Sequence, residues 1–309
     1  KTLAFTNWNT TLQATNVLIQ SGGRLTASGP FTNPQMSNRV HVVCTNLTID
    51  AGGWIDTDGK GYKPENGPGK GTETGEDWSP GAGHGGKGGP AGGTASGPSS
   101  HSVGGPANDS LTDPVLPGSG GTSWSTASGG RGGGVVRLEV AGTLTVNGTI
   151  SANAVSLQPG IGWPGYASGG GAGGSVFVTC GTFGGGTGGL VRVQGSGGDP
   201  TGGYDQGAGG GAGGRIAVRY ANVATEHAVR FSAGAGGGWR SNNWDNAWYQ
   251  APEMGTMYGP DARLLSPLLV DEQFQDVRLS LGVSHWEVDN LTVSNCGVVF
   301  AQEGFTFVV

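Results

Sequence analysis

The chain has 309 residues, of which 66 are glycine and 16 are proline; 12% of its residues are charged and its formal net charge at pH 7 is −6. Such a composition is typical of collagen or of a disordered chain, but the glycines follow no strict Gly-X-Y register and apolar alternation continues through the glycine-rich half. The low, negative charge disfavours nucleic-acid binding, which needs a basic stripe, and no apolar run approaches the about 18 residues of a membrane-spanning helix.

Residues 1–59 are expected to form a series of short β-strands separated by glycine-containing turns. Apolar residues recur at every second position, which is typical of a half-buried strand and not of a helix. The strands are expected at residues 16–19, 24–27, 40–44, 47–49 and 54–56. The region ends in a turn, Asp58-Gly59-Lys60-Gly61.

Residues 60–134 form a long insert that is rich in glycine, proline, serine and threonine. A structureless loop of this length is unusual inside a compact domain and would argue against assigning the whole chain to one stack of strands. Two alternatives are open. Either the insert is mobile, or its segments lie side by side as extended, polyproline-II-like strands, since missing side chains let backbones approach closely. We favour partial order, because the same composition recurs at 160–175 and 196–214, directly beside expected strands.

Residues 135–238 contain a sequence repeat of constant length. Three glycine clusters each lead directly into an alternating apolar strand, and they lie at equal intervals, at residues 133–134, 173–174 and 213–214. A fixed period of this size is typical of a repeat architecture in which successive copies stack. We therefore expect Val136, Val176 and Ile216 to share one face of neighbouring strands. The same pattern relates 144–146 to 47–49 and 148–153 to 53–58.

Residues 239–266 differ from the rest because aromatic side chains are concentrated there. Exposed Trp and Tyr rings can stack on sugar rings, and nearby Asp and Asn side chains can bond to sugar hydroxyls. The candidate carbohydrate-binding residues are Trp239, Trp244, Trp248 and Tyr249. The alternative is that these rings cover the side of the fold or fill a subunit interface, where Trp and Tyr are enriched.

Residues 267–309 return to short strands, and part of this region matches the start of the chain. Residues 16–19 and 23–25 align without a gap to 290–293 and 297–299. An unpaired strand edge is a template for another chain, and a head-to-tail contact whose rotation does not close produces a filament. The expected assembly interface comprises Asn16, Ile19, Leu25, Leu291, Val293, Val299, Phe305 and Phe307. Two alternatives stay open: a domain cut from a longer polypeptide, and a monomer whose own loops cover its ends.

Residues 47–62, 142–153 and 209–218 resemble glycine-rich right-handed parallel β-helix segments of large secreted or surface, adhesin-like proteins. The resemblance covers most of residues 15–235 and departs from the family pattern at Ala154, where glycine is usual. It implies an all-β, right-handed parallel β-helix (β-solenoid) with long glycine-rich loops, in one elongated unit over residues 1–309. It carries over no catalytic residue.

The nearest approach to a metal or acid–base site is Asp56-Thr57-Asp58-Gly59. Two carboxylates two residues apart share one face of a strand and can bind Ca²⁺ or act as an acid–base pair. The alternative, which we favour, is a turn closed by Asx hydrogen bonds, because a glycine follows. The five histidines show no ligand spacing, and no catalytic residue is nominated. The sequence therefore predicts a protein that is not an enzyme, with Ca²⁺ as its one candidate cofactor.

The three cysteines lie far apart and show no metal-binding spacing. Cys44 and Cys180 fall in apolar strand patterns typical of inert buried thiols, whereas Cys296 is a candidate for pairing between chains. Asn-X-Ser/Thr sequences mark candidate glycosylation sites of a secreted protein at Asn9, Asn46, Asn108, Asn147 and Asn290. The first residue is Lys1 and not Met, which suggests a processed chain or an excised fragment.

These expectations lead to one functional hypothesis and one alternative. The hypothesis is an extracellular or cell-surface structural protein that assembles head-to-tail into a fibre or forms part of a surface adhesin. Its expected partners are copies of itself and cell-surface or matrix polysaccharide. The alternative is a polysaccharide-binding or polysaccharide-degrading β-helix module, a lyase or glycoside hydrolase, that uses the aromatic residues of 239–262.

Overall fold

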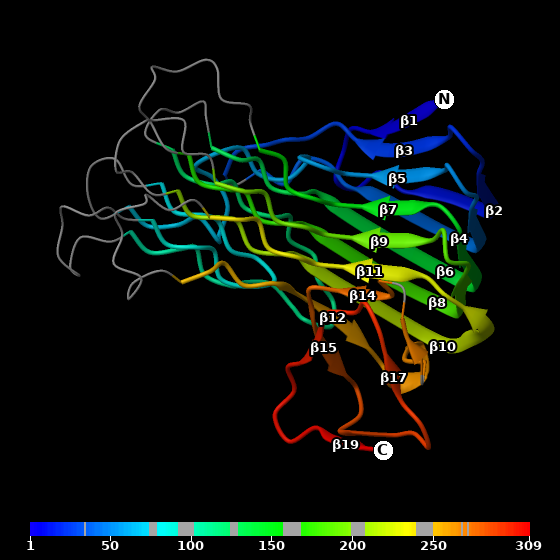
Figure 1. Cartoon of the computed structure of the whole chain (residues 1–309). Helices are drawn as coiled ribbons and strands as arrows, with labels where there is room; N and C mark the ends of the chain where they lie inside the picture. The colour runs from blue at the N-terminus through cyan, green and yellow to red at the C-terminus, as the bar shows by residue number, and fades with distance from the viewer. Residues whose placement is uncertain are drawn as a thin grey trace.

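The computed structural model describes residues 1–33, 35–73, 79–91, 102–123, 129–156, 168–198, 208–238, 250–266, 268–270 and 272–309. The protein is all-β, and its named strands pair in parallel (Figure 1). The prediction of an all-β fold with parallel strands is confirmed. A short 3₁₀ turn spans Ala262–Leu264.

Two large sheets contain most of the strands. Within the described residues, the seven-stranded sheet has the order β1 (Thr2–Phe5), β3 (Arg24–Ala27), β5 (Trp54–Asp56), β7 (Thr149–Ser151), β9 (Leu190–Arg192), β11 (Arg230–Ser232) and β14 (Phe274–Gln275). The eight-stranded sheet there has the order β18 (Val298–Phe300), β15 (Val277–Leu281), β12 (Gly255–Gly259), β10 (Arg215–His227), β8 (Ser175–Gly185), β6 (Val135–Val146), β4 (Val40–Ile49) and β2 (Leu12–Ile19). From β1 to β12 successive strands alternate between the two sheets, so every two consecutive strands add one strand to each sheet.

Side chains from both sheets form one hydrophobic core. Val136, Val176 and Ile216 are fully buried, and the register pairs Val136 with Val176 and Val176 with Ile216. The stacking predicted from the constant repeat length is therefore confirmed. It follows from strand geometry, since alternate residues point into the core while intervening residues such as Arg137 point outward. Burying one such aliphatic side chain contributes about 1.5–3 kcal/mol.

The strand register also confirms the predicted matches of residues 47–49 with 144–146 and of residues 53–58 with 148–153. Leu47 pairs with Leu144 across β4 and β6, and Ile55 pairs with Ile150 across β5 and β7. Further along the core, three phenylalanine rings stack in succession: the ring centroids of Phe183 and Phe231 are 6.0 Å apart, and those of Phe231 and Phe274 are 5.7 Å apart.

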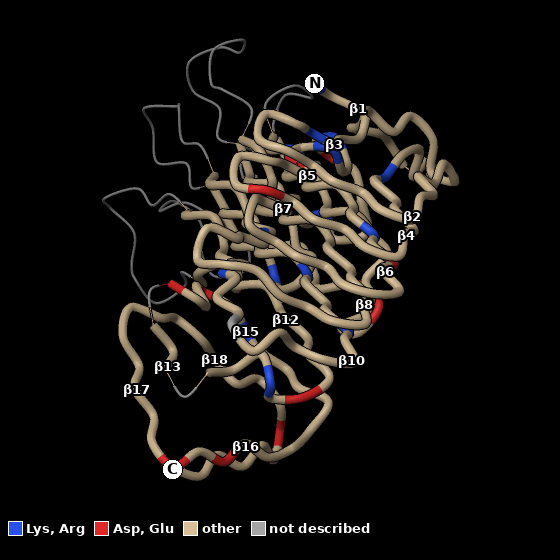
Figure 2. Tube along the Cα trace, turned by 90° about the vertical axis from the view of Figure 1, so that its right-hand side faces the viewer, with Lys and Arg blue, Asp and Glu red and all other residues tan. Residues whose placement is uncertain are grey.

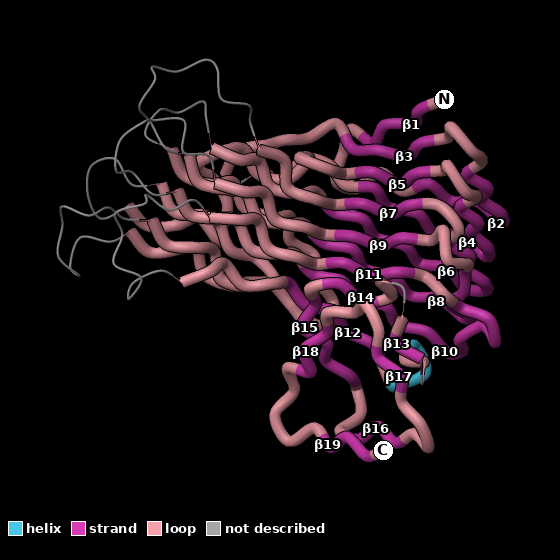
Figure 3. Tube along the Cα trace, viewed as in Figure 1, coloured by secondary structure: helices cyan, strands magenta, loops and turns pink. Residues whose placement is uncertain are grey.

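The glycine-rich segments leave the strands and run side by side as extended chains (Figure 3). We call the described segments 60–72, 79–91, 102–106, 118–123, 129–134, 168–174, 193–198, 208–214, 232–238 and 250–254 the glycine bundle. Where it is described, the predicted partial order of residues 60–134 is confirmed. Ala82 N, for example, donates to Gly170 O at 2.9 Å, and Gly83 N donates to Gly69 O at 2.8 Å.

Segment 208–214 shows how the bundle differs from a sheet. Its backbone exchanges hydrogen bonds of 2.7–3.1 Å with six described neighbours. Two of them, 79–85 and 86–91, are the halves of segment 79–91, which folds back so that Gly81 N donates to Gly89 O; the others are 168–174, 193–198, 232–238 and 250–254. A strand in a sheet has two neighbours. Six neighbours are consistent with extended chains of threefold, polyproline-II type, whose carbonyl and amide groups point in several directions around the axis.

Glycine is required in the bundle because the backbones touch one another. A Cβ added at Gly211 would lie less than 3.0 Å from the carbonyl group of Gly171. By contrast, a Cβ at Gly237, in the segment 232–238, would meet no atom within 4 Å. The close contact explains why so many glycines occur here without the positive φ that usually selects them.

Towards the C-terminus fewer residues separate a strand from the strand that pairs with it, and the chain no longer enters the glycine bundle. Val277 in β15 pairs with Val298 in β18, and β16 (His285–Glu287) pairs with β19 (Thr306–Val308) through His285 and Thr306, so both pairs have the same spacing along the chain. A further pair joins β13 (Leu268–Leu269) to β17 (Thr292–Val293). The two chain ends predicted to be equivalent differ in the structure. Residues 16–19 lie in the eight-stranded sheet but β17 does not, and β3 and β18 belong to different sheets.

Candidate functional site

The N-terminal end of the two sheets presents two strand edges. Strand β1 pairs with β3 and strand β2 pairs with β4, and each is the last strand of its sheet. Leu3 is 50% exposed and Leu18 is 57% exposed, although both are large apolar residues. An open hollow of about 550 Å³ lies between these strands, lined by residues 1–3 and 18–25. This end therefore combines a free strand edge with exposed apolar surface.

The C-terminal end carries a second apolar surface. Strand β18 is the opposite edge of the eight-stranded sheet from β2. Val299 in β18 is 47% exposed, Val293 in β17 is 54% exposed and Phe307 in β19 is 43% exposed. The ring of Phe307 stacks on the buried Trp286 with centroids 5.0 Å apart, so this exposed ring is held by an aromatic contact.

The predicted assembly residues fall into two groups. Val293, Val299 and Phe307 are exposed, and so is Asn16, whose Oδ1 accepts a hydrogen bond from Asn46. Leu291 and Phe305 are half-buried. Ile19 and Leu25 instead belong to the hydrophobic core, because their side chains point between the two sheets. The sequence did not single out Leu3 and Leu18; the alternation of β2, in which Leu18 precedes the buried Ile19, is the signal that could have identified Leu18.

The two ends also differ in charge. The exposed basic residues Lys1 and Arg24 lie at the N-terminal end, whereas Glu287, Asp289 and Glu303 are exposed at the C-terminal end. Figure 2 shows basic residues near β3 and acidic residues near β16 and the C-terminus. Opposite charges at the two ends favour contact between unlike ends over contact between like ends.

Asp56 and Asp58 are hydrogen-bonded and paired with protein groups. The carboxylate of Asp56 is buried, pairs with Arg24 and accepts a hydrogen bond from Asp58 N at 2.8 Å. Asp58 accepts from Ser151 Oγ and from Asn153 N, the latter at 2.7 Å. The bond from Asp58 N to Asp56 forms the predicted Asx-type turn, and the Asp58 carboxylate joins this turn to residues 151–153. No group of three or more His, Cys, Asp or Glu residues that could hold a metal ion occurs in the described part of the chain, and calcium binding stays a prediction.

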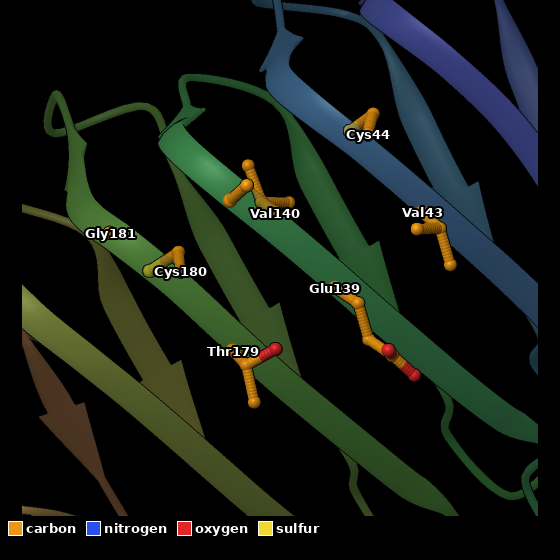
Figure 4. Close-up of a pocket in the computed structure, with 8 residues that line it drawn as sticks. Val43, Cys44, Glu139, Val140, Thr179, Cys180 and Gly181 are labelled. Carbon is orange, nitrogen blue, oxygen red and sulfur yellow. The ribbon is translucent and has the colours of Figure 1, made fainter.

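A shallow groove of about 390 Å³ on the eight-stranded sheet lies over two thiols (Figure 4). Cys44 in β4 and Cys180 in β8 flank Val140 in β6, and both are buried, as predicted. Burial raises the pKa of the Cys180 thiol to about 12 and raises the pKa of Cys44 as well, so both thiols stay protonated and inert. Cys296 is a free, half-buried thiol.

The candidate glycosylation sites differ in accessibility. Asn9 and Asn290 are exposed, whereas Asn46, Asn108 and Asn147 are half-buried. The Nδ2 of Asn108 donates to two backbone carbonyls, Gly83 O and Pro106 O, so a glycan, which replaces one of the two hydrogens on this atom, would remove one of those bonds. Asn9 and Asn290 are therefore the better candidates.

Comparison with protein-family models, curated proteins and solved structures finds no match. Among the described residues, no helix has both the length and the hydrophobicity needed to cross a membrane. The carbohydrate-binding candidates Trp239, Trp244, Trp248 and Tyr249 lie outside the described residues. The two sheet ends are therefore the site from which function is argued.

Proposed function

We propose that this chain is an extracellular structural protein of the right-handed parallel β-helix class, which assembles head-to-tail into a fibre or a surface adhesin. The chain's alternation between two parallel, in-register sheets supports the β-helix class. The glycine bundle supports a structural role, since its segments are joined to one another by many backbone hydrogen bonds. One observation carries the assembly proposal: the eight-stranded sheet ends in a free edge with exposed apolar side chains on both sides.

The geometry of the edges defines the contact. Strands β2 and β18 are opposite edges of one parallel sheet, so β18 of one copy continues onto β2 of the next without reversing strand direction. The contact is heterologous and leaves a free edge on each partner, which permits growth. Exposed Val299 and Phe307 then meet Leu3 and Leu18 of the next copy.

The proposal is tested by measuring assembly of the purified chain against concentration, with light scattering and negative-stain microscopy. The chain is expected to form elongated particles. Leu18→Lys and Val299→Lys are each expected to abolish them, because either places an ammonium group in the apolar contact. Val115→Lys is the matched control, since Val115 is exposed but lies away from both ends. A monodisperse monomer at every concentration, or equal assembly of all variants, would refute the proposal.

A further inference from the structure

His84 is a titratable residue that the assembly contact does not use, and its side chain is 0% exposed. It lies where the glycine bundle meets the outer face of the eight-stranded sheet. Its Nδ1 is 3.0 Å from Asn108 Oδ1, and its Nε2 is 2.9 Å from the Oγ of Ser175 in β8. Asn108 belongs to residues 106–117, which we call the strap, because they bond to outward-facing side chains of β6, β8 and β10.

The hydrogen bonds around His84 define its protonation state. Because Asn108 Nδ2 donates to backbone carbonyls, Asn108 Oδ1 faces the ring and Nδ1 of His84 carries the proton. In the neutral ring Nε2 is then an acceptor, and the Ser175 hydroxyl is its donor. The same Oγ lies 2.7 Å from Leu116 O, so its one proton serves only one of two acceptors at a time. With a second proton on its ring, His84 Nε2 would donate to the Ser175 oxygen and leave the hydroxyl proton for Leu116 O, so all these bonds would be satisfied. The ring would then carry a positive charge in a site that is closed to solvent.

Burial dominates the electrostatics of this cluster. It lowers the pKa of His84 to about 4, and Arg215 acts in the same direction. The Asp109 carboxylate, 4.0 Å from Nε2, opposes the shift only in part. Asp109 also accepts hydrogen bonds from Val115 N and Leu116 N at 2.8 and 2.7 Å, which hold it within the strap.

Other charged groups lie one step away from the ring. Arg278 in β15 donates to Gly85 O, directly after His84 in the chain, and pairs with Glu253 at 3.2 Å. Lys87 N donates to the same Glu253 carboxylate. These pairs are partly exposed and sit at the rim of the cluster, so water screens their effect on the ring.

The strap is the outermost layer over His84. Most of its residues are exposed or half-buried. Side chains of the sheet attach it: Arg215 Nε donates to Asn108 O at 2.7 Å, Arg219 Nε donates to Thr112 O at 3.0 Å, and Arg137 pairs with Asp113 at 3.0 Å. One backbone hydrogen bond also joins the strap to the bundle, from Asn108 N to His84 O at 2.9 Å, whereas many backbone hydrogen bonds join the segments of the bundle to one another. Moving the strap is therefore the smallest change that brings water to the ring.

Ser175, His84 and Asn108 have the order of a nucleophile, a base and an orienting residue. Ser175 and His84 are both fully buried, however, and the hydroxyl is bonded to Leu116 O. No substrate reaches the hydroxyl while the strap is closed, so the closed state offers no catalytic site.

We propose that His84 is a proton-sensitive latch: a second proton on its ring releases the strap from the eight-stranded sheet, while the glycine bundle and both sheets stay folded. A solvated histidine has an ordinary pKa of 6.5, and the closed site has a pKa of about 4. The pKa of His84 is lower in the closed state than in the open state, so protonation favours the open state. The contribution of the neutral ring to closure is fully present above pH 6.5, decreases as the pH falls, and is lost below about pH 4. The opening equilibrium of the strap rises by on the order of a few hundredfold across that range.

The first test uses the unmodified protein. Nuclear magnetic resonance of the imidazole nitrogens should show the Nδ1–H tautomer of His84 at neutral pH, with protonation well below pH 6.5 and coupled to loss of strap signals. The exposed His285 supplies reference imidazole signals from outside the cluster in the same spectra. Protonation of His84 at or above pH 6.5, or protonation with no change in the strap, would overturn the proposal.

The second test is hydrogen exchange at pH 7 and pH 4, corrected for the intrinsic exchange rate. The Asn108 amide, which donates to His84 O across the contact between strap and bundle, should lose protection at low pH, while the Gly170 and Gly211 amides of the bundle keep theirs. His84→Gln should remove this pH dependence and His285→Gln should leave it intact. Simultaneous loss of protection in strap and bundle would contradict a local latch, and so would an unchanged pH dependence in His84→Gln.

Discussion

Substituting one glycine of the bundle tests whether backbone contact, and not backbone flexibility, selects glycine there. A Cβ at Gly211 would lie less than 3.0 Å from the Gly171 carbonyl, so segments 208–214 and 168–174 must move apart. Two hydrogen bonds join these segments, Gly170 N to Gly209 O at 2.9 Å and Gly173 N to Ala212 O at 3.0 Å. Weakening two bonds at about 1 kcal/mol each, together with about 1–3 kcal/mol for overpacking, predicts that Gly211→Ala lowers the free energy of unfolding by about 3–5 kcal/mol.

Gly237→Ala is the matched control for this prediction. The site has open space and a φ outside the left-handed region, so alanine fits there. By restricting the unfolded chain, Gly237→Ala should leave the stability unchanged or raise it by about 0.4–1 kcal/mol. Urea denaturation of both variants, followed by circular dichroism, measures the difference. If Gly211→Ala were as stable as Gly237→Ala, the close packing of the bundle would be refuted.

Two further predictions concern the core. Phe231 is fully buried between two stacked phenylalanine rings, so Phe231→Ala should lower the free energy of unfolding by about 3–5 kcal/mol in the same denaturation assay; a loss below about 1 kcal/mol would contradict the stack. A thiol reagent at pH 8 should modify Cys296 alone in the native protein and all three cysteines in urea, because burial keeps Cys44 and Cys180 protonated. Equal reaction of all three in the native protein would be inconsistent with that burial.

The sequence predicted the central stack well, and the reason is physical. Val136, Val176 and Ile216 recur at a fixed spacing after identical glycine pairs, and apolar residues recur at every second position after them, so both the inward face and the register were determined locally. The same holds for Leu47 and Leu144. Strand alternation is a local property, and equal repeat lengths transfer it from one copy to the next.

The ends of the chain could not be predicted in the same way. Residues 16–19 and 290–293 share an apolar alternation that any half-buried strand shows, and sheet membership depends on how many strands precede them. The chain also becomes shorter between one strand and the strand that pairs with it after the bundle ends, as the pairing of Val277 with Val298 shows. An ungapped alignment of the two chain ends assumes that this spacing is constant.

The bundle and the latch depend on contacts that leave little trace in sequence. A glycine segment has no side chain whose periodicity could reveal its neighbours, so the six neighbours of residues 208–214 are apparent only in three dimensions. His84 and Ser175 lie far apart in the chain and show no motif spacing. Their contact arises because the insert folds back over the outer face of β8.

Head-to-tail assembly through the ends of the eight-stranded sheet is tested most directly by cross-linking two variants. In a Cys296→Ser background, one preparation carries Leu18→Cys and a second, isotopically labelled preparation carries Val299→Cys. After mixing and mild oxidation, mass spectrometry identifies which chains are joined. The account predicts a disulfide between position 18 of one copy and position 299 of another, well above either like-with-like product. Like-with-like products alone, or no cross-link at concentrations where particles form, would contradict it.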